Sequence, residues 1–412
     1  MVAPVPMLTP ADSARTVGAV YTVSLLAVLP VATAAASAFA LRRARAEGRV
    51  LVWRAAIVLL LSMVVVRPFL SHSMAWVVPA ALATPLVALG RVQMMTSWIS
   101  SASDQVAAAG ALSTVEMLLV LYLGGVMLVL LPTAVVIARM RRIAARAREP
   151  DARSGRALEQ ARERLGVRRR VRVLVSHEVA VPMTWGVWRP VIVCPASTVK
   201  WSDDELRIAL LHELTHVARN DWLFAIVARV ACALYWFHPG VWYVARRLRG
   251  DCELACDDSV LAAGVRASDY AALLLRAAQS LARTERPAAA LALSRRCGLR
   301  ARLQSIVDVS RSTAPIGRAW RRAAATLTVA LVWPMSAIQL APTRDVLTRL
   351  MRDASWEVRA YAVLGLAQRP DTVAVARKAA ELDPSPRVRA WARYALGERP
   401  RPVTFDELVE RP

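Results

Sequence analysis

Long apolar runs separated by arginine-rich segments dominate the hydrophobic pattern of this 412-residue chain. A transmembrane helix needs about 20 consecutive apolar residues. Four runs with almost no charged residue meet or approach this length, at residues 16–41, 50–66, 117–138 and 323–343. The second run includes Arg54 near one end, from where its side chain could extend to the membrane interface. The pattern predicts a mainly α-helical integral membrane protein with four transmembrane helices.

Arginine clusters beside these runs predict their orientation. If the four runs cross the membrane in turn, the clusters at 42–49, 139–148 and 318–322 all fall on one side. The positive-inside rule makes that side the cytoplasm. The chain then divides into a membrane region at 1–148, a cytoplasmic domain at 149–317, a fourth transmembrane helix at 318–343 and an extracytoplasmic domain at 344–412.

Composition supports the membrane interpretation and limits the partners. The mean hydropathy of +0.37 is higher than in most soluble globular chains. The net charge of +23 comes almost entirely from arginine. These arginines lack the spacing of a zinc finger or a ribonucleoprotein motif, so direct nucleic-acid binding is not expected. The five cysteines all lie in the predicted cytoplasmic domain, where thiols stay reduced.

Two further apolar stretches are not assigned as spans. Residues 74–90 contain two prolines, which favours an interfacial or re-entrant segment. Residues 222–245 contain the sequence HPG at 238–240, a natural bend. The motif that precedes this second stretch decides its interpretation.

The sequence HELTH has the spacing of a zinc-binding helix. His212 and His216 lie one helical turn apart on one face, so both imidazoles can bind one Zn²⁺. Glu213 points about 100° away and can accept a proton from water at the metal. Ser202 and Glu205 have the capping-box spacing that begins a helix. The alternative is a pair of solvated or core histidines on an amphipathic helix.

A catalytic zinc site needs a third protein ligand, and the downstream sequence offers several candidates. His238 lies in the bend, whereas Glu253 and Asp257 lie one turn apart on a second helical segment. One of these carboxylates can bind the metal while the other orients a ligand histidine. Ligands must converge closely, but a bilayer core is about 30 Å thick. Residues 222–245 are therefore expected to form a buried or membrane-grazing hairpin.

These segments together resemble the BlaR/MecR-type membrane metallopeptidases, the bacterial antirepressor family. The resemblance rests on VPMTWGVWRPVIVCP (181–195), HELTHVARNDWL (212–223), YWFHPGVWYVARRLRGDCELACDD (235–258), SDYAALLL (268–275) and LRARLQSIV (299–307). It implies a gluzincin-like α+β zinc peptidase domain with His212, His216 and Glu253 as zinc ligands and Glu213 as general base. Asp257 would support a ligand, and His238 could stabilise the developing oxyanion, with packing in the bend as the alternative.

A gluzincin-like fold also implies a small sheet whose edge strand holds the substrate above the active-site helix. The apolar segments VRVLVS (171–176) and PVIVCP (190–195) are rich in β-branched residues and could supply this sheet. Cys252 and Cys256, close to Glu253, are expected to be small buried packing residues.

The same resemblance implies a multi-pass protein of the bacterial cell membrane that answers an external signal by cleaving a cytoplasmic repressor of the BlaI/MecI type. Lipid and a protein substrate are then its partners. The alternatives are quality control of membrane proteins, as in the related HtpX-like proteases, and a receptor with a degenerate peptidase domain. The penicillin-binding sensor of the family is not expected, because STVK (197–200) lies in the cytoplasmic domain without the S-D-N or K-T-G elements.

A short repeat occupies the C-terminal region. WEVRAYAVLGLA (356–367) aligns with PRVRAWARYALG (386–397), and another helical stretch precedes each. Paired helices at this period resemble HEAT-like repeats. Residues 404–410 could begin a third repeat, or the array could dimerise, since at least three repeats are usually needed for stability. The predicted role is recognition of an unknown extracellular ligand or protein, and the alternative is a passive helical cap.

Overall fold

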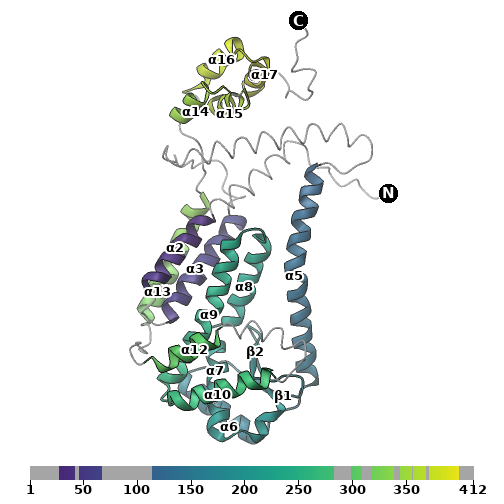
Figure 1. Ribbon diagram of the computed structural model, residues 1–412, viewed down its shortest axis with the longest axis vertical. Coiled ribbons are helices and arrows are strands. Elements are labelled where there is room, and N and C mark those ends of the chain that lie inside the picture. Colours follow the sequence, from purple (N-terminus) through teal and green to yellow (C-terminus); the bar gives the residue numbers. More distant parts are fainter. Residues whose placement is uncertain are drawn as a thin grey trace, which may run out of the picture. The chain divides into compact units, whose positions relative to one another are not determined.

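Two compact units make up the computed structural model of the chain. The residues that the structure describes are 27–41, 46–66, 114–282, 298–308, 317–337, 344–354, 356–367 and 371–398. The larger unit comprises Ala27–Ser62 and Gly125–Val332, and the other includes the helices between 344 and 398. The prediction of a mainly α-helical protein is confirmed (Figure 1).

A three-stranded sheet lies in the larger unit. Strand β3 (Val191–Pro195) is central and pairs in parallel with β1 (Arg172–Ser176) and antiparallel with β2 (Met183–Trp185). The apolar segments at 171–176 and 190–195 therefore form strands, as predicted. Strand β2, which the sequence pattern did not reveal, forms the edge of the sheet that contacts helix α7.

Helices pack around this sheet and supply most of the core. They are α6 (Ala152–Leu165), α7 (Asp203–Ala218), α10 (Ala267–Ala282) and α12 (Leu299–Val307), with a short 3₁₀ helix, η4 (Ala196–Lys200), between β3 and α7. The shared core contains Val173, Ile192, Leu206, Leu210, Leu214, Val260 and Tyr270. The stretch STVK falls within η4, which directly precedes α7 in the chain.

The predicted spans correspond to apolar helices only in part. These helices are α2 (Val28–Ala40), α3 (Ala46–Val65), α5 (Thr114–Arg146) and α13 (Arg318–Ala337). Among the described residues, α3 and α5 alone are long and apolar enough to cross a membrane. The first predicted span is described from residue 27 and the fourth up to residue 337, while 74–90 lies outside the described residues. The described chain thus contains two candidate spans, where the sequence pattern predicted four.

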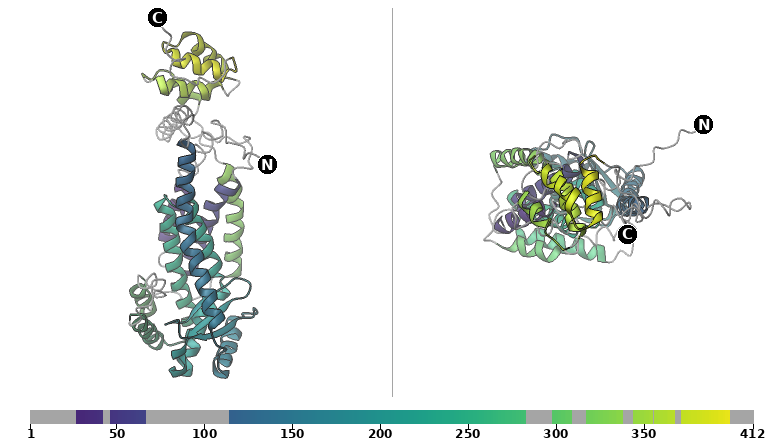
Figure 2. Two further views of the ribbon diagram at one scale, coloured as in Figure 1. Left: turned by 90° about the vertical axis from the view of Figure 1, so that its right-hand side faces the viewer. Right: turned by 90° about the horizontal axis from the view of Figure 1, so that it is seen from above.

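The apolar run at 222–245 turns back on itself, as predicted. Helix α8 (Asp221–Leu234) ends at Tyr235, and α9 (Pro239–Ala262) begins after His238. Proline suits the first turn of a helix, where its missing N–H leaves no bond unmade. The N–H of His238 donates to the carbonyl of Tyr235 at 2.9 Å and closes the turn. Both helices of this hairpin run beside α3 (Figures 1 and 2).

Two arginines of α3 point into the protein. Arg54 forms an ion pair with Asp221 at the start of α8, and its guanidinium lies 4.1 Å from the centre of the Phe224 ring. Arg49 forms an ion pair with Asp251 of α9 at 2.8 Å. The expectation that Arg54 extends to a membrane interface is therefore wrong. A carboxylate inside the protein neutralises its charge instead.

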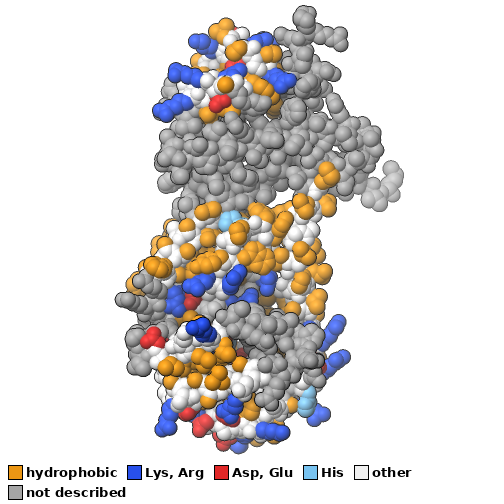
Figure 3. All heavy atoms as spheres, viewed as in Figure 1, with side chains coloured by type: hydrophobic (Ala, Val, Ile, Leu, Met, Phe, Trp, Pro, Cys, Tyr) orange, Lys and Arg blue, Asp and Glu red, His pale blue; other side chains and the backbone are white. Residues whose placement is uncertain are grey.

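Apolar side chains cover much of the surface around α2, α8 and α13, whereas charged side chains gather around α6 (Figure 3). Large exposed apolar residues in the first region are Val28, Phe39, Leu223, Phe237, Trp320, Leu327 and Val329. An exposed apolar surface of this extent is typical of contact with lipid or with another protein.

Among the residues that the structure describes between 344 and 398, which we call the C-terminal unit, there are two helix pairs. They are α14 (Arg344–Leu350) with α15 (Trp356–Ala367), and α16 (Val373–Leu382) with α17 (Pro386–Ala395). Helices α15 and α17 carry the repeated sequence, so the prediction of paired helices is confirmed. The repeated positions Val358, Ala360, Ala362, Leu366, Val388, Ala390 and Ala392 are buried. Residues 404–410, where a third repeat was predicted, lie outside the described residues.

A buried ion pair joins the two helix pairs. Arg359 of α15 donates to both carboxylate oxygens of Asp383, at 3.0 and 3.1 Å, and to the carbonyl of Asp353 at 2.7 Å. The Arg359 side chain is 11% exposed and that of Asp383 is 5% exposed. Because both charges are nearly removed from water, losing one leaves the other without compensation.

Replacing Arg359 with leucine is expected to destabilise the C-terminal unit by about 3 kcal/mol, because the buried Asp383 carboxylate loses its cation. Hydrogen–deuterium exchange of peptides from 344–398 measures this as faster exchange in α15 and α16. Arg393→Leu, at an exposed position of α17, is the control and should change stability by less than about 0.5 kcal/mol. Equal exchange in the two variants would contradict the role of the ion pair.

Candidate metal centre

Helix α7 carries the HELTH motif through the middle of the larger unit. The helix begins at a capping box, in which the Ser202 hydroxyl accepts from the Glu205 N–H and the Glu205 carboxylate accepts from the Ser202 N–H. Such reciprocal bonds satisfy two N–H groups that a helix start leaves unpaired. They fix where α7 starts, and the 3.6-residue period then places His212 and His216 on one face.

The hairpin brings Glu253 of α9 to these two histidines. His212 Nε2 lies 3.7 Å from Glu253 Oε2, and His216 Nε2 lies 3.8 Å from Glu253 Oε1. The two imidazole centres are 5.0 Å apart. Ligand atoms of a tetrahedral zinc ion, each at about 2.0–2.1 Å, are about 3.3 Å from one another. The donor set and its spacing therefore fit a zinc ion with small side-chain movements.

Tyr270, Asp257 and Arg302 support His212 from behind. His212 Nδ1 lies 2.9 Å from the Tyr270 hydroxyl, which donates to Asp257 at 2.5 Å. Arg302 of α12 donates to both oxygens of Asp257, at 2.7 and 2.8 Å. Because the hydroxyl proton is given to Asp257, His212 must donate from Nδ1 to the hydroxyl oxygen. Its Nε2 lone pair is then free to face a metal.

Asp221 holds His216 in the same way. His216 Nδ1 lies 2.8 Å from Asp221 Oδ2, which leaves Nε2 directed toward Glu253. Asp221 begins α8 immediately after Asn220, whose φ of 56° lies in the left-handed region. Asparagine adopts this region more readily than most residues. The tight turn that Asn220 makes between α7 and α8 places Asp221 beside the histidine.

Buried cations keep the carboxylates of the site ionised. Burial opposes ionisation of Glu253, but Arg302 at 3.0 Å and the two histidines hold its pKa well below the usual range. For Asp221, burial is again outweighed, by the His216 hydrogen bond and by Arg219 and Arg54, and its pKa falls to about 2. Glu253, a candidate metal ligand, is thus anionic at neutral pH, and so is Asp221, which accepts from His216.

Cys256 lies close enough to offer a second set of metal ligands. Its Sγ is 3.4 Å from His216 Nδ1 and 3.7 Å from Asp221 Oδ2. Burial raises the Cys256 pKa to about 11, so the thiol is protonated at neutral pH when no metal is bound. Asp221 is also already neutralised by Arg54 and Arg219. Both sets are candidate metal sites, and the set formed by His212, His216 and Glu253 is the one that the HELTH motif predicts.

Glu213 faces the edge of the sheet. Its Oε2 accepts a hydrogen bond of 2.7 Å from the Thr184 hydroxyl of β2, and its carbonyl lies 3.3 Å from the same hydroxyl. The side chain is buried beside His212 on α7. The candidate proton acceptor is therefore held between the metal ligands and the edge strand.

The structure does not bring His238 to this site. His238 lies just before α9, whereas Glu253 is 15 residues further along the helix, which corresponds to about 22 Å at 1.5 Å per residue. Stabilisation of an oxyanion by His238 is therefore excluded in this arrangement. Its alternative role, in the bend of the hairpin, agrees with its position.

Four residues around the site were not singled out from the sequence: Thr184, Asp221, Tyr270 and Arg302. Asp221 carried a local signal, because a carboxylate five residues after a helical histidine can reach back to it across a turn. Tyr270 and Arg302 lie 58 and 45 residues from their partners His212 and Asp257, and no spacing rule connects them. Both do fall within segments that carried the family resemblance.

Comparison with known proteins agrees with the family resemblance that these segments carried. The family described as BlaR1 peptidase M56 matches residues 20–306, and HEAT repeats match residues 343–411. Regulatory protein BlaR1 of Bacillus licheniformis is 37% identical over 92 residues, which are 22% of this chain and 15% of that protein. The methicillin resistance mecR1 protein of Staphylococcus aureus is 30% identical over 95 residues, 23% of this chain and 16% of that protein. The matched stretches thus cover a small part of each relative.

The two ligand sets can be separated by zinc content. Glu253→Ala is expected to abolish retention of zinc, because two imidazoles alone leave the ion an incomplete set of protein ligands. Cys256→Ala should retain about one zinc per chain, as a structural or catalytic site does. Elemental analysis of each purified variant, after dialysis against a weak chelator, gives the answer. Loss of zinc from Cys256→Ala with retention in Glu253→Ala would assign the ion to the other set.

Proposed function

This chain belongs to the BlaR1 peptidase M56 family, and from that premise we propose that it is a membrane-bound zinc endopeptidase of the gluzincin type. In this proposal it cleaves a cytoplasmic transcriptional repressor when a signal arrives from outside the cell. The observation that carries the peptidase part is the convergence of His212, His216 and Glu253 beside Glu213.

Each residue of the site has a separate part in the proposed reaction. His212, His216 and Glu253 would hold the zinc ion, which when bound supplies Lewis-acid activation of water and of the peptide carbonyl. Glu213 takes a proton from the attacking water and delivers it to the leaving amine. Since the Thr184 hydroxyl engages Oε2 of Glu213, the other carboxylate oxygen is left for proton transfer.

Strand β2 supports the binding of an extended peptide. Among the described strands, β2 pairs only with β3, so its other edge has main-chain groups available for a further strand. A substrate strand added there would gain main-chain hydrogen bonds with little dependence on its sequence. The contact between Thr184 and Glu213 would keep such a peptide close to the proton acceptor.

The arginine clusters and the apolar surface support a peptidase domain on the cytoplasmic face of the bacterial cell membrane. Helices α3 and α5 would cross the bilayer, and the α8–α9 hairpin would enter it beside α3. The charged surface around α6 would remain in water. This arrangement keeps the metal centre near the membrane surface, on the side where a soluble substrate arrives.

A repressor of the BlaI/MecI type is the proposed substrate. This part rests on the similarity to BlaR1, a regulatory protein, and to mecR1, a methicillin resistance protein. DNA binding would belong to the substrate and not to this chain. The HEAT repeats, which we place outside the cell, would bind an unknown ligand or protein and so supply the signal.

The proposed function is tested by comparing wild type with Glu213→Gln in the native host. The substitution preserves side-chain size but removes the proton acceptor, so cleavage should fall by at least about 10²-fold. Mass spectrometry of newly formed protein N-termini detects each cut. Glu159→Gln, at an exposed position of α6, is the matched control and should cleave like wild type.

The number and identity of the Glu213-dependent cuts decide between the candidate functions. One cut in a soluble DNA-binding protein supports the antirepressor. Cuts spread over many membrane proteins support quality control instead. No difference between wild type and Glu213→Gln under any condition leaves a receptor without peptidase activity and overturns the proposal.

A further inference from the structure

One face of α3 makes polar contacts with both helices of the hairpin at the level of the metal centre. Arg49 and Trp53 donate to the two oxygens of Asp251 on α9, at 2.9 and 2.8 Å. Arg54 forms its ion pair with Asp221 of α8. At the start of α3, the N–H of Ala46 donates to Asp258 at 3.3 Å. Three polar side chains of a predominantly apolar helix, Arg49, Trp53 and Arg54, thus contact the two helices that carry or support the candidate metal ligands.

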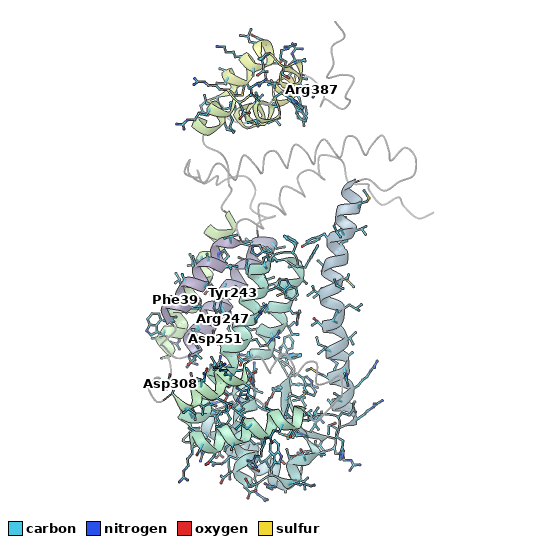
Figure 4. All side chains as sticks on the ribbon, viewed as in Figure 1. Phe39, Tyr243, Arg247, Asp251, Asp308 and Arg387 are labelled. Atoms are coloured by element: carbon cyan, nitrogen blue, oxygen red, sulfur yellow. The ribbon has the colours of Figure 1, made fainter. Side chains whose placement is uncertain are left out.

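The contact with α9 is tightly packed. Tyr243, Arg247 and Asp251 follow one another along α9 at intervals of one turn (Figure 4). The Trp53 ring lies edge-on to Tyr243, with centres 5.9 Å apart, while its indole N–H reaches Asp251. Trp53 itself is fully buried. Because Asp251 precedes Glu253 by two residues on a continuous helix, α3 fixes the height and rotation of α9 close to the ligand.

The contact with α8 reaches the metal centre through one intermediate residue. Arg54 binds Oδ1 of Asp221, and Oδ2 of the same carboxylate binds His216 Nδ1 at 2.8 Å. The two oxygens of one carboxylate thus connect a residue of α3 to a histidine of α7. Removing Arg54 would free Asp221 to turn toward Arg219, which lies 3.5 Å away.

The contact of α3 near the tip of the hairpin is of a different kind. There the Tyr235 hydroxyl donates to the carbonyl of Leu60 at 2.8 Å, and Ile57 and Leu60 of α3 are fully buried. A charged side chain is expensive in an apolar helix and is found there mainly where it has a specific role. Both arginines of α3 lie at the base of the hairpin, beside the candidate metal ligands, and packing alone does not explain this position.

We propose that Arg54 is a positioning residue for the metal ligand His216, acting through Asp221, and that Arg49 and Trp53 position Glu253 through Asp251. The polar face of α3 thereby sets the separation between His216 and Glu253. A shift or rotation of this candidate membrane helix changes both ligands together, which gives a signal at the membrane direct access to metal binding. The inference rests on the proposed zinc peptidase.

The test measures zinc affinity of the full chain in detergent by competition with a chromophoric chelator. Arg54→Met, which keeps the length of the side chain without its charge, is expected to weaken zinc binding about tenfold, as loss of a partner behind a ligand does. Arg54→Lys, which keeps a cation for Asp221, should recover most of that loss. Trp53→Phe removes the hydrogen-bond donor to Asp251 and leaves Arg54 in place. It should weaken zinc binding severalfold.

Tyr235→Phe is the matched control, because it removes a hydrogen bond between α3 and the hairpin at the end away from the ligands. Its zinc affinity should stay within about twofold of wild type. Visible absorption of the Co²⁺-loaded proteins adds a readout of ligand geometry, which should change in Arg54→Met and not in Tyr235→Phe.

Each result has one meaning. Unchanged affinity and Co²⁺ spectrum in Arg54→Met and Trp53→Phe overturn the inference, and so does equal weakening in Tyr235→Phe, which would indicate general packing. If Arg54→Met fails to fold, Arg54→Lys and Trp53→Phe decide by the same two readouts. A wild-type chain that binds no zinc removes the proposed peptidase itself, an outcome distinct from the failure of α3 to influence a functional site.

Discussion

The carboxylates that α8 and α9 bury impose the constraint on which the rest of the larger unit depends. An ionised carboxylate taken out of water destabilises a fold by several kcal/mol unless a cation and hydrogen bonds compensate it. Cations meet this need from other elements: Arg54 for Asp221, Arg49 for Asp251, and Arg302 for Glu253 and Asp257. Helices α3 and α12 are remote in sequence from the hairpin, and both must pack against it to supply these cations. The candidate metal centre lies beside these contacts.

The same pairing affects how the centre would act on a metal. Glu253 forms an ion pair with Arg302 at 3.0 Å, so part of its charge is already compensated. A carboxylate in this situation donates less charge to a bound ion, which leaves the ion the stronger Lewis acid. Asp221 and Tyr270 act in the opposite direction, because each accepts the Nδ1 proton of a ligand histidine and makes that imidazole more basic. The balance between these groups comes from the fold and cannot be assigned to any single ligand.

The sequence predicted what depends on neighbouring residues and missed what depends on distant ones. Helix α7, its capping box and the bend before α9 follow from local patterns, and each is present. Spacing alone does not identify the third ligand among His238 and two carboxylates, because separation along a chain does not give distance across a turn. The position of the Arg54 side chain was wrongly predicted, because an arginine in an otherwise apolar run is expected to extend its charge to the membrane surface. Its partner lies 167 residues away, where no window can include it.

The two candidate membrane helices differ in a way that bears on signalling. In α5, none of the apolar stretch is buried within the protein, whereas half of that in α3 is. A helix whose apolar side chains mostly face away from the rest of the protein can anchor a domain. Its movement has few packed side chains through which it could affect the candidate metal centre. Every residue of α3 except Val65 is buried or half-buried, and one side of the helix contacts the hairpin, so a displacement of α3 must be accommodated there. The residues on the side that contacts the hairpin are the partners of the carboxylates beside His216 and Glu253. In our proposal, the requirement to neutralise buried charge thus makes the helix that supports the candidate metal centre also the helix best placed to disturb it.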